Sequence, residues 1–137
     1  MGDSSLKEIK ILDLSRLLPG PACTWYLQGM GASVDRIEPI KGDLTRFIPP
    51  LQEGVGVYFR CFSKGKRSMA LDFRHPLAAE LIRKLIPNYD VVVEGFKPNV
   101  LEAMGLAPDD LLKINPQLIV ARLSGYGQTG PWSNRPG

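Results

Sequence analysis

The sequence contains few of the residues that build metal sites and disulfide frameworks. Among its 137 residues there are two cysteines, Cys23 and Cys61, and one histidine, His75. The cysteine spacing matches no metal-ligand pattern, so we expect reduced thiols and no metal site. His75 precedes a proline where a helix is expected to start, which favours a role near the helix cap over that of a catalytic base.

Long apolar runs are missing as well. No run approaches the roughly 18 apolar residues that a membrane-spanning helix needs, and the start, MGDSSLKEIK, lacks the apolar centre of a signal peptide. We therefore expect no membrane segment and a cytoplasmic location. The net charge of +3 is too small for the basic face of a nucleic-acid-binding protein, but it suits a small ligand that carries phosphate.

The chain does contain a regular alternation of strand-like and helix-like segments. Strands are expected at residues 9–15, 32–39, 68–74, 90–96 and 117–127, the last running into a glycine-rich loop. Helices are expected at residues 22–31, 75–90, 99–104 and 107–115. This order predicts an α/β fold in one domain over residues 1–137, with an open, mostly parallel sheet and flanking helices.

Two segments carry more specific expectations. In the helix at 75–90, Pro76 suits the first turn, and Leu77, Leu81, Ile82 and Leu85 form an apolar stripe at helical spacing. Residues 40–63 are rich in glycine and proline and are expected to form a long irregular excursion, of the kind that is often functional.

Ligands of open parallel sheets bind beyond the carboxyl ends of the strands. Three expected loops meet this condition: residues 15–22, 94–98 and 124–131. Neither a G-x-G-x-x-G turn after the first strand nor a P-loop motif is present, which argues against those two nucleotide-binding motifs.

The charged residues leave two interpretations open. Lys64, Lys66, Arg67 and Arg74 form either a solvated face or an anion site, and the first three precede their strand, which starts them at the opposite edge of the sheet unless the excursion folds back. Asp72 and Glu94 stand near expected strand ends, where they could act as acid–base groups or form salt bridges.

Five longer segments can be compared with known families as a set. They are ILDLSRLLPGPACT (11–24), GASVDRIEPIKGDLTR (31–46), YFRCFSKGKRSMALDFRHP (58–76), DVVVEGFKPNVLEAMGL (90–106) and INPQLIVARLSGYGQTGPWSNRPG (114–137). In this order and spacing they resemble the N-terminal part of family III CoA-transferases, the CaiB/BaiF group, which includes formyl-CoA transferase, carnitine CoA-transferase and α-methylacyl-CoA racemase. The resemblance implies the N-terminal part of the family's large CoA-binding, Rossmann-like domain, with the rest of the fold absent from this chain.

The resemblance also implies a set of site residues. The positions expected to bind coenzyme A are Leu18, Pro19, Lys66, Arg67, Leu71, Asp72, Phe73, Arg74, Gly95, Phe96 and Lys97. Many members have basic residues at the positions of Pro39 and Ala103, so some phosphate contacts are expected to be weaker or re-routed here. No catalytic residue is carried over, because the family's catalytic positions fall after Gly137.

The function implied is transfer of coenzyme A between carboxylic acids through acyl-CoA thioesters. Acyl-CoA and the carboxylic acids would be substrates, no prosthetic group is implied, and the family forms interlocked homodimers. Two alternatives stay open: a 2-methylacyl-CoA racemase, and a non-catalytic CoA- or nucleotide-binding module if the natural chain is this short.

Overall fold

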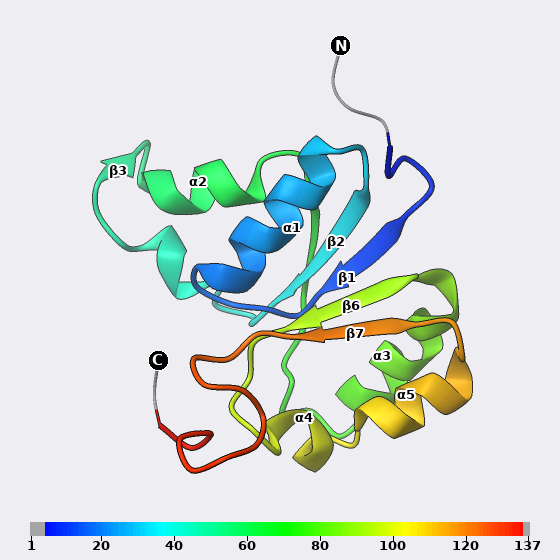
Figure 1. Ribbon diagram of the computed structural model, residues 1–137. Coiled ribbons are helices and arrows are strands. Elements are labelled where there is room, and N and C mark those ends of the chain that lie inside the picture. Colours follow the sequence, from blue (N-terminus) through cyan, green and yellow to red (C-terminus); the bar gives the residue numbers. More distant parts are fainter. Residues whose placement is uncertain (1–4, 136–137) are drawn as a thin grey trace.

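The computed structural model describes residues 5–135 and contains a parallel sheet between two helical layers (Figure 1). Its five strands are β1 (Lys10–Asp13), β2 (Ser33–Glu38), β5 (Arg67–Ala70), β6 (Val91–Glu94) and β7 (Ile119–Arg122). They lie in the order β5-β2-β1-β6-β7, and every neighbouring pair is parallel. The predicted fold class is therefore confirmed. The ends of the expected domain, residues 1–4 and 136–137, lie outside the described residues.

Helices cover both faces of this sheet. They are α1 (Pro19–Gly29), α2 (Val57–Ser63), α3 (Ala78–Leu85), α4 (Val100–Ala103) and α5 (Pro108–Ile114). Helices α1 and α2 lie on one side, and α3, α4 and α5 lie on the other (Figure 1).

Two apolar clusters hold the three layers together. Under α1, Ile11, Val34 and Val93 are buried and contact Leu27. On the opposite face, the buried side chains include Leu12, Ile37, Ile82, Leu101 and Leu111, which come from two strands and from α3, α4 and α5. Alternate residues of β1 and β2 thus serve the two cores, as expected for strands buried on both faces.

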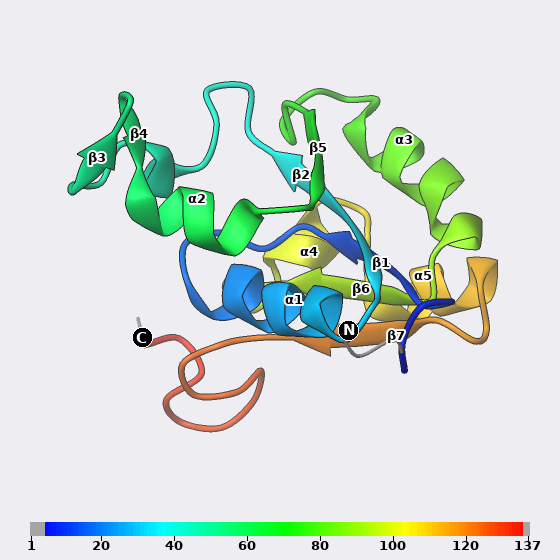
Figure 2. The same ribbon diagram turned by 90° about the horizontal axis from the view of Figure 1, so that it is seen from above.

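Residues 40–63 are more regular than the sequence predicts. They contain a 3-10 helix η1 (Leu44–Arg46), a short hairpin of β3 (Leu51–Gln52) and β4 (Val55–Gly56), and helix α2. In Figure 2 the hairpin lies beyond the end of α2, away from the five-stranded sheet. Helix α2 is stabilised by tertiary contacts: Phe62 packs edge-on against Trp25 of α1, with ring centroids 5.6 Å apart.

Two predicted elements need correction. Strand β5 ends at Ala70, so residues 71–74 form a loop beyond the sheet and not the last part of a strand. Helix α3 begins at Ala78, which places Pro76 in the preceding turn and leaves Leu77 60% exposed. The buried positions of this segment are Ala78, Ile82 and Ile86, and these follow the helical i, i+4 spacing from the true start.

The strand order creates a switch point between β1 and β6. The chain leaves β1 toward β2 and β5 on one side, then returns to place β6 and β7 on the other. The loops after β1 and β6 therefore diverge at one place on the carboxyl edge, where open α/β sheets bind ligands.

Candidate functional site

A cleft runs along the carboxyl edge of the sheet, and we call it the strand-end cleft. One part has a volume of about 700 Å³ and a second part a volume of about 380 Å³. The first part is lined by Arg16, Pro39, Ile40, Lys41, Gly42, Leu44, Phe47, Leu71, Asp72, Phe73 and Arg74. The second is lined by Arg16, Leu17, Asp43, Leu44, Gly95, Phe96, Lys97 and Val100. Arg16 and Leu44 belong to both parts and mark the place where they meet.

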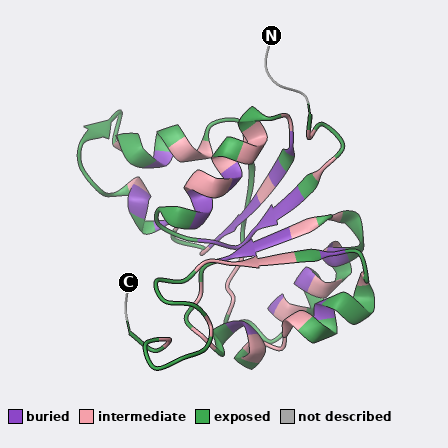
Figure 3. Cartoon of the chain, in the orientation of Figure 1, coloured by how far each residue is buried: buried purple, intermediate pink, exposed green. Residues whose placement is uncertain are grey.

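At the carboxyl edge of the sheet, the buried strands give way to more exposed loops (Figure 3). The loops after β1, β2, β5 and β6 all contribute to the cleft. The sequence predicted the loops after β1 and β6, and the resemblance added residues 71–74. For the loop after β2, the resemblance implied a phosphate-contact position at Pro39, and residues 40–63 were expected only as an excursion that is often functional. The glycine-rich loop 124–131 lines neither part.

An apolar wall separates the cleft from the core. Phe73 and Phe96 pack edge to face with ring centroids 5.9 Å apart, and both contact the cluster beneath α3 and α4. Leu71 packs against the same cluster while also lining the cleft. A flat ligand group would therefore meet aromatic and aliphatic carbon here.

Basic side chains stand around this wall. Within the described residues, the side chains of Arg16, Lys41 and Lys97 form no hydrogen bond or ion pair, and the side chain of Arg74 pairs only with its half-buried neighbour Asp72 at 3.3 Å. Arg74 also lines an adjoining hollow of about 620 Å³ between residues 73–79 and 98–104. These cations have few internal partners, so they are available to anionic groups of a ligand.

Lys66 lies in a different environment from these four cations. Its side chain is 1% exposed, and its Nζ donates to Thr24 Oγ1 at 2.6 Å and to the Pro21 carbonyl at 2.8 Å, and lies 3.3 Å from Asp13 Oδ2. Burial lowers the pKa of Lys66, and the Asp13 carboxylate acts against that shift. The amine is thus occupied inside the protein, so Lys66 belongs neither to a solvated face nor to the cleft.

Arg67 also lies away from the cleft. It starts β5 beside Asp35 of β2, and its Nε is 2.5 Å from Asp35 Oδ1. The direction of β5 explains this placement, because residues that enter a parallel strand lie at its amino end. The expectation that the basic loop starts at the opposite edge therefore holds for Arg67.

The other predicted positions divide into two groups. Leu71, Asp72, Phe73, Arg74, Gly95, Phe96 and Lys97 are brought together along the cleft. Leu18 and Pro19 are exposed residues at the start of α1, beside the cleft residue Leu17. Arg16, Lys41 and Leu44 also line the cleft, and no local signal in the sequence distinguishes them, although Arg16 lies within the expected loop 15–22.

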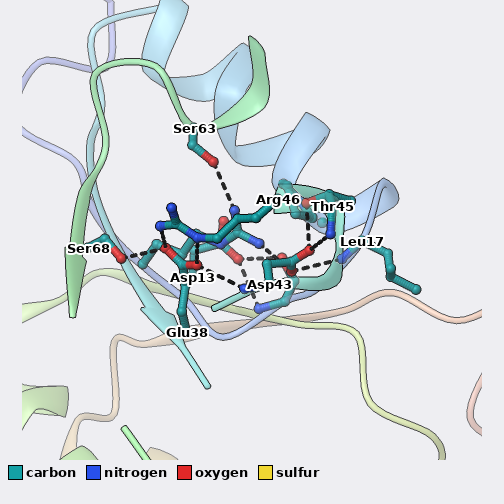
Figure 4. Close-up of polar contacts among 12 residues, drawn as sticks. Asp13, Leu17, Glu38, Asp43, Thr45, Arg46, Ser63 and Ser68 are labelled. Atoms are coloured by element: carbon teal, nitrogen blue, oxygen red, sulfur yellow. Dashed lines mark hydrogen bonds and ion pairs between the residues drawn. The ribbon is translucent and has the colours of Figure 1, made fainter. Parts of the chain in front are cut away.

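A buried carboxylate anchors the loop after β2. Glu38 accepts hydrogen bonds from Arg46 at 2.8 Å, from Ser68 Oγ at 2.6 Å and from the Asp43 amide at 3.0 Å (Figure 4). Burial by itself raises the pKa of Glu38, but the hydrogen bonds and the Arg46 charge outweigh it and lower the pKa to about 2. Glu38 therefore holds the wall of the cleft as an ionised group.

The candidate acid–base residues prove to be ion-paired. Glu94 is fully buried and accepts a hydrogen bond from Arg122 Nε at 2.6 Å. His75 Nδ1 accepts a hydrogen bond from the Leu77 amide at 3.2 Å, as expected of a residue near a helix start.

Within residues 5–135, no group of three or more His, Cys, Asp and Glu side chains could hold a metal ion, and no helix is long and apolar enough to span a membrane.

The fold and the site define a class of protein: a parallel α/β domain whose cleft, at the switch point of the sheet, is lined by cations that can bind an anionic ligand. Comparison with known proteins identifies the family: the model of CoA-transferase family III matches residues 6–137. The chain belongs to this family.

Relatives and solved structures agree with that assignment. The chain is 42% identical over 134 residues to the beta subunit of succinyl-CoA–L-malate CoA-transferase from Chloroflexus aurantiacus, covering 96% of the chain and 33% of that protein. It is 40% identical to succinyl-CoA:glutarate CoA-transferase of Mus musculus, with 96% and 31% covered. A CAIB/BAIF family protein from Brucella suis superposes with a TM-score of 0.91 at 39% identity, over 98% of the chain and 37% of that structure. The chain thus spans about a third of the length of the curated relatives it matches.

Proposed function

We propose that this chain is the N-terminal, CoA-binding part of an enzyme that transfers coenzyme A between carboxylic acids through acyl-CoA thioesters. The observation that carries the proposal is the strand-end cleft, in which an aromatic wall is surrounded by cations that have few internal partners. The relatives described above are named as CoA-transferases, which supports this reaction over the racemase alternative.

In this proposal coenzyme A lies along the loops after β5 and β6. Its adenine packs near Phe73 and Phe96, and its phosphates face Arg74 and Lys97, where a charged donor contributes most. The two parts of the cleft lie in series around Arg16 and Leu44, an arrangement that suits an elongated ligand.

The role assigned to this chain is binding and orientation. Thioester exchange needs a carboxylate placed beside the reacting carbon. Asp13 and Glu94 are enclosed in internal networks, and Asp72 is paired with Arg74 in the part of the cleft where this proposal places the phosphates. We therefore expect the reacting carboxylate to come from beyond these 137 residues. We also expect the whole protein to act as a homodimer in the cytoplasm, without a prosthetic group.

The test uses the full-length protein that contains this chain, with Arg74→Ala and Lys97→Ala. Loss of one charge-assisted hydrogen bond is worth roughly 1.5–3 kcal/mol, so each change should raise KM for the thioester about tenfold to hundredfold and lower kcat less. Lys113→Ala is the control, because Lys113 is an exposed residue of α5, which leads into the amino end of β7. Its kinetics should be unchanged.

Two results would contradict the proposal. Unchanged KM for the thioester in both Arg74→Ala and Lys97→Ala would mean that these residues are solvated surface charges and do not bind CoA. Binding of CoA without any transfer by the full-length protein would favour a non-catalytic CoA-binding module.

A further inference from the structure

Asp43 joins two walls of the strand-end cleft from within the protein. Its side chain is 1% exposed, and its Oδ2 accepts hydrogen bonds from Arg36 Nη2 at 2.6 Å and from the Leu17 amide at 3.2 Å. Its Oδ1 accepts from the amide and the hydroxyl of Thr45, at 2.8 and 2.6 Å (Figure 4). One carboxylate thus fixes the loop after β1 and the first turn of η1.

The loop after β1 needs such a support. Leu17 has φ of 61°, in the left-handed region that residues other than glycine rarely adopt. Its side chain is 48% exposed, so apolar packing gives the conformation little support. Its amide donates to Asp43 Oδ2, so Asp43 supports the backbone directly beside Arg16.

Arg16 is the cation at the junction of the two parts of the cleft. Other arginines near this edge are neutralised: Arg36 by Asp43, and Arg46 by Glu38. Arg16 forms no hydrogen bond or ion pair within residues 5–135. Its planar guanidinium can therefore bind an oxyanion with two parallel hydrogen bonds.

We propose that Asp43 is a positioning residue that holds Arg16 at the junction of the cleft, where Arg16 binds an oxyanion of a substrate. The oxyanion is either a phosphate of the CoA thioester or the carboxylate of the free acid. This inference rests on the proposed function and adds to it a binding residue and the group that orients it. Leu44, held through η1 by the same carboxylate, also lines both parts of the cleft at the junction.

A double-mutant cycle tests whether Asp43 acts through Arg16. KM is measured for the acyl-CoA thioester and for the free carboxylic acid. In the full-length protein, Arg16→Gln should raise KM for at least one of these two substrates about tenfold to hundredfold and lower kcat less. Asp43→Asn keeps the side-chain shape but turns an amide group toward the donors of Arg36 and Leu17, and it should raise the same KM. Added to Arg16→Gln, it should raise that KM by less than about twofold, because the side chain that it positions is gone.

Comparison of KM for the thioester with KM for the free acid identifies the oxyanion that Arg16 binds. The thioester should be one whose acyl group carries no carboxylate. A KM rise confined to this thioester identifies a phosphate, and a rise confined to the free acid identifies a carboxylate; a rise in both also supports oxyanion binding. Effects of the two changes that multiply in the cycle would overturn the positioning role, and an Arg16→Gln protein with wild-type KM values would overturn the binding role.

Two further proteins keep the test decisive. If Asp43→Asn fails to fold, Thr45→Val replaces it in the cycle, because it removes only one of the hydrogen bonds to Asp43. It should give a smaller KM rise that again disappears beside Arg16→Gln, and an unchanged KM would refute the proposal. Arg60→Gln is the control, since it breaks only the exposed Arg60–Glu53 pair and should leave the kinetics unchanged.

The proposed function and this inference can fail separately. If the wild-type protein transfers no CoA, the proposed function fails. The double-mutant cycle is then measured with Kd in place of KM, by calorimetric titration with CoA and with a dicarboxylic acid. Equal Kd values for wild type and Arg16→Gln with both probes would refute the inference. If transfer is present and the cycle is multiplicative, only the inference fails.

Discussion

Replacing Glu38 by glutamine should remove a large, pH-dependent part of the stability of this domain. Glu38 is 3% exposed and its carboxylate is surrounded by donors from Arg46, Ser68 and the Asp43 amide. Glutamine keeps the shape of the side chain but loses the charge and turns an NH₂ group toward some of these donors. The ion pair with Arg46 is thereby broken while Arg46 keeps its charge.

The pKa shift of Glu38 gives the size of its contribution to the free energy of unfolding. The pKa of Glu38 falls from 4.5 to about 2 on folding, and one pKa unit corresponds to about 1.4 kcal/mol, so the network stabilises the domain by up to about 3 kcal/mol. This is an upper value, because Arg46 is 34% exposed and water screens its charge. Since the folded-state pKa is the lower one, the stabilisation is complete above pH 4.5 and is lost as the pH falls through about 2.

Urea unfolding of the 137-residue chain at several pH values between 7 and 2 measures this effect. At pH 7, Glu38→Gln should unfold with a free energy lower by about 3 kcal/mol, and the gap to wild type should narrow below pH 4.5 and nearly close by pH 2. Other carboxylates titrate in both proteins and cancel in the difference. Glu53→Gln, which breaks an exposed pair, should cost under about 1 kcal/mol at every pH. A Glu38→Gln gap that stays constant from pH 6 to pH 2 would refute the reasoning.

The remaining predictions concern Lys66 and the isolated chain. Lys66→Met should lower the free energy of unfolding by about 3–5 kcal/mol, because Asp13 loses its buried cation, and Lys64→Met should have almost no effect; equal urea midpoints for wild type and Lys66→Met would contradict this. The isolated chain should bind CoA weakly or not at all in calorimetry, since it spans about a third of the length of its relatives, and low-micromolar affinity would show that the cleft is sufficient for binding. The isolated chain should also neither transfer CoA from an acyl-CoA to a carboxylate nor exchange an α-proton in deuterated water. Turnover that is lost on Asp72→Ala would place the active site within this chain.

Local sequence signals were enough for much of the fold. The apolar run at 90–96 and its neighbours gave strands buried on both faces, and such strands occur with helical crossovers and parallel pairing. The prediction was poorer for α2, because the segment was expected to be part of an irregular excursion and its Val57, Tyr58, Phe59 and Phe62 have low helix propensity. Packing of Phe62 on Trp25, and of Phe59 against Arg46 at 3.8 Å from the ring centroid, overrides that propensity.

The sequence by itself determined the fold class and the edge of the sheet where a ligand is expected to bind. Periodicity and strand direction carry that information, because the side chains that follow parallel strands must gather at one edge. The site residues 71–74 and 95–97 came from the family resemblance, and the remaining lining of the cleft came from the structure. Only the tertiary structure decided which charges are free. Lys66 and Arg16 look alike as basic residues in loops, yet Lys66 is buried against Asp13 and Arg16 has no partner among the described residues. That difference depends on contacts between residues far apart in the chain, which composition and spacing do not encode.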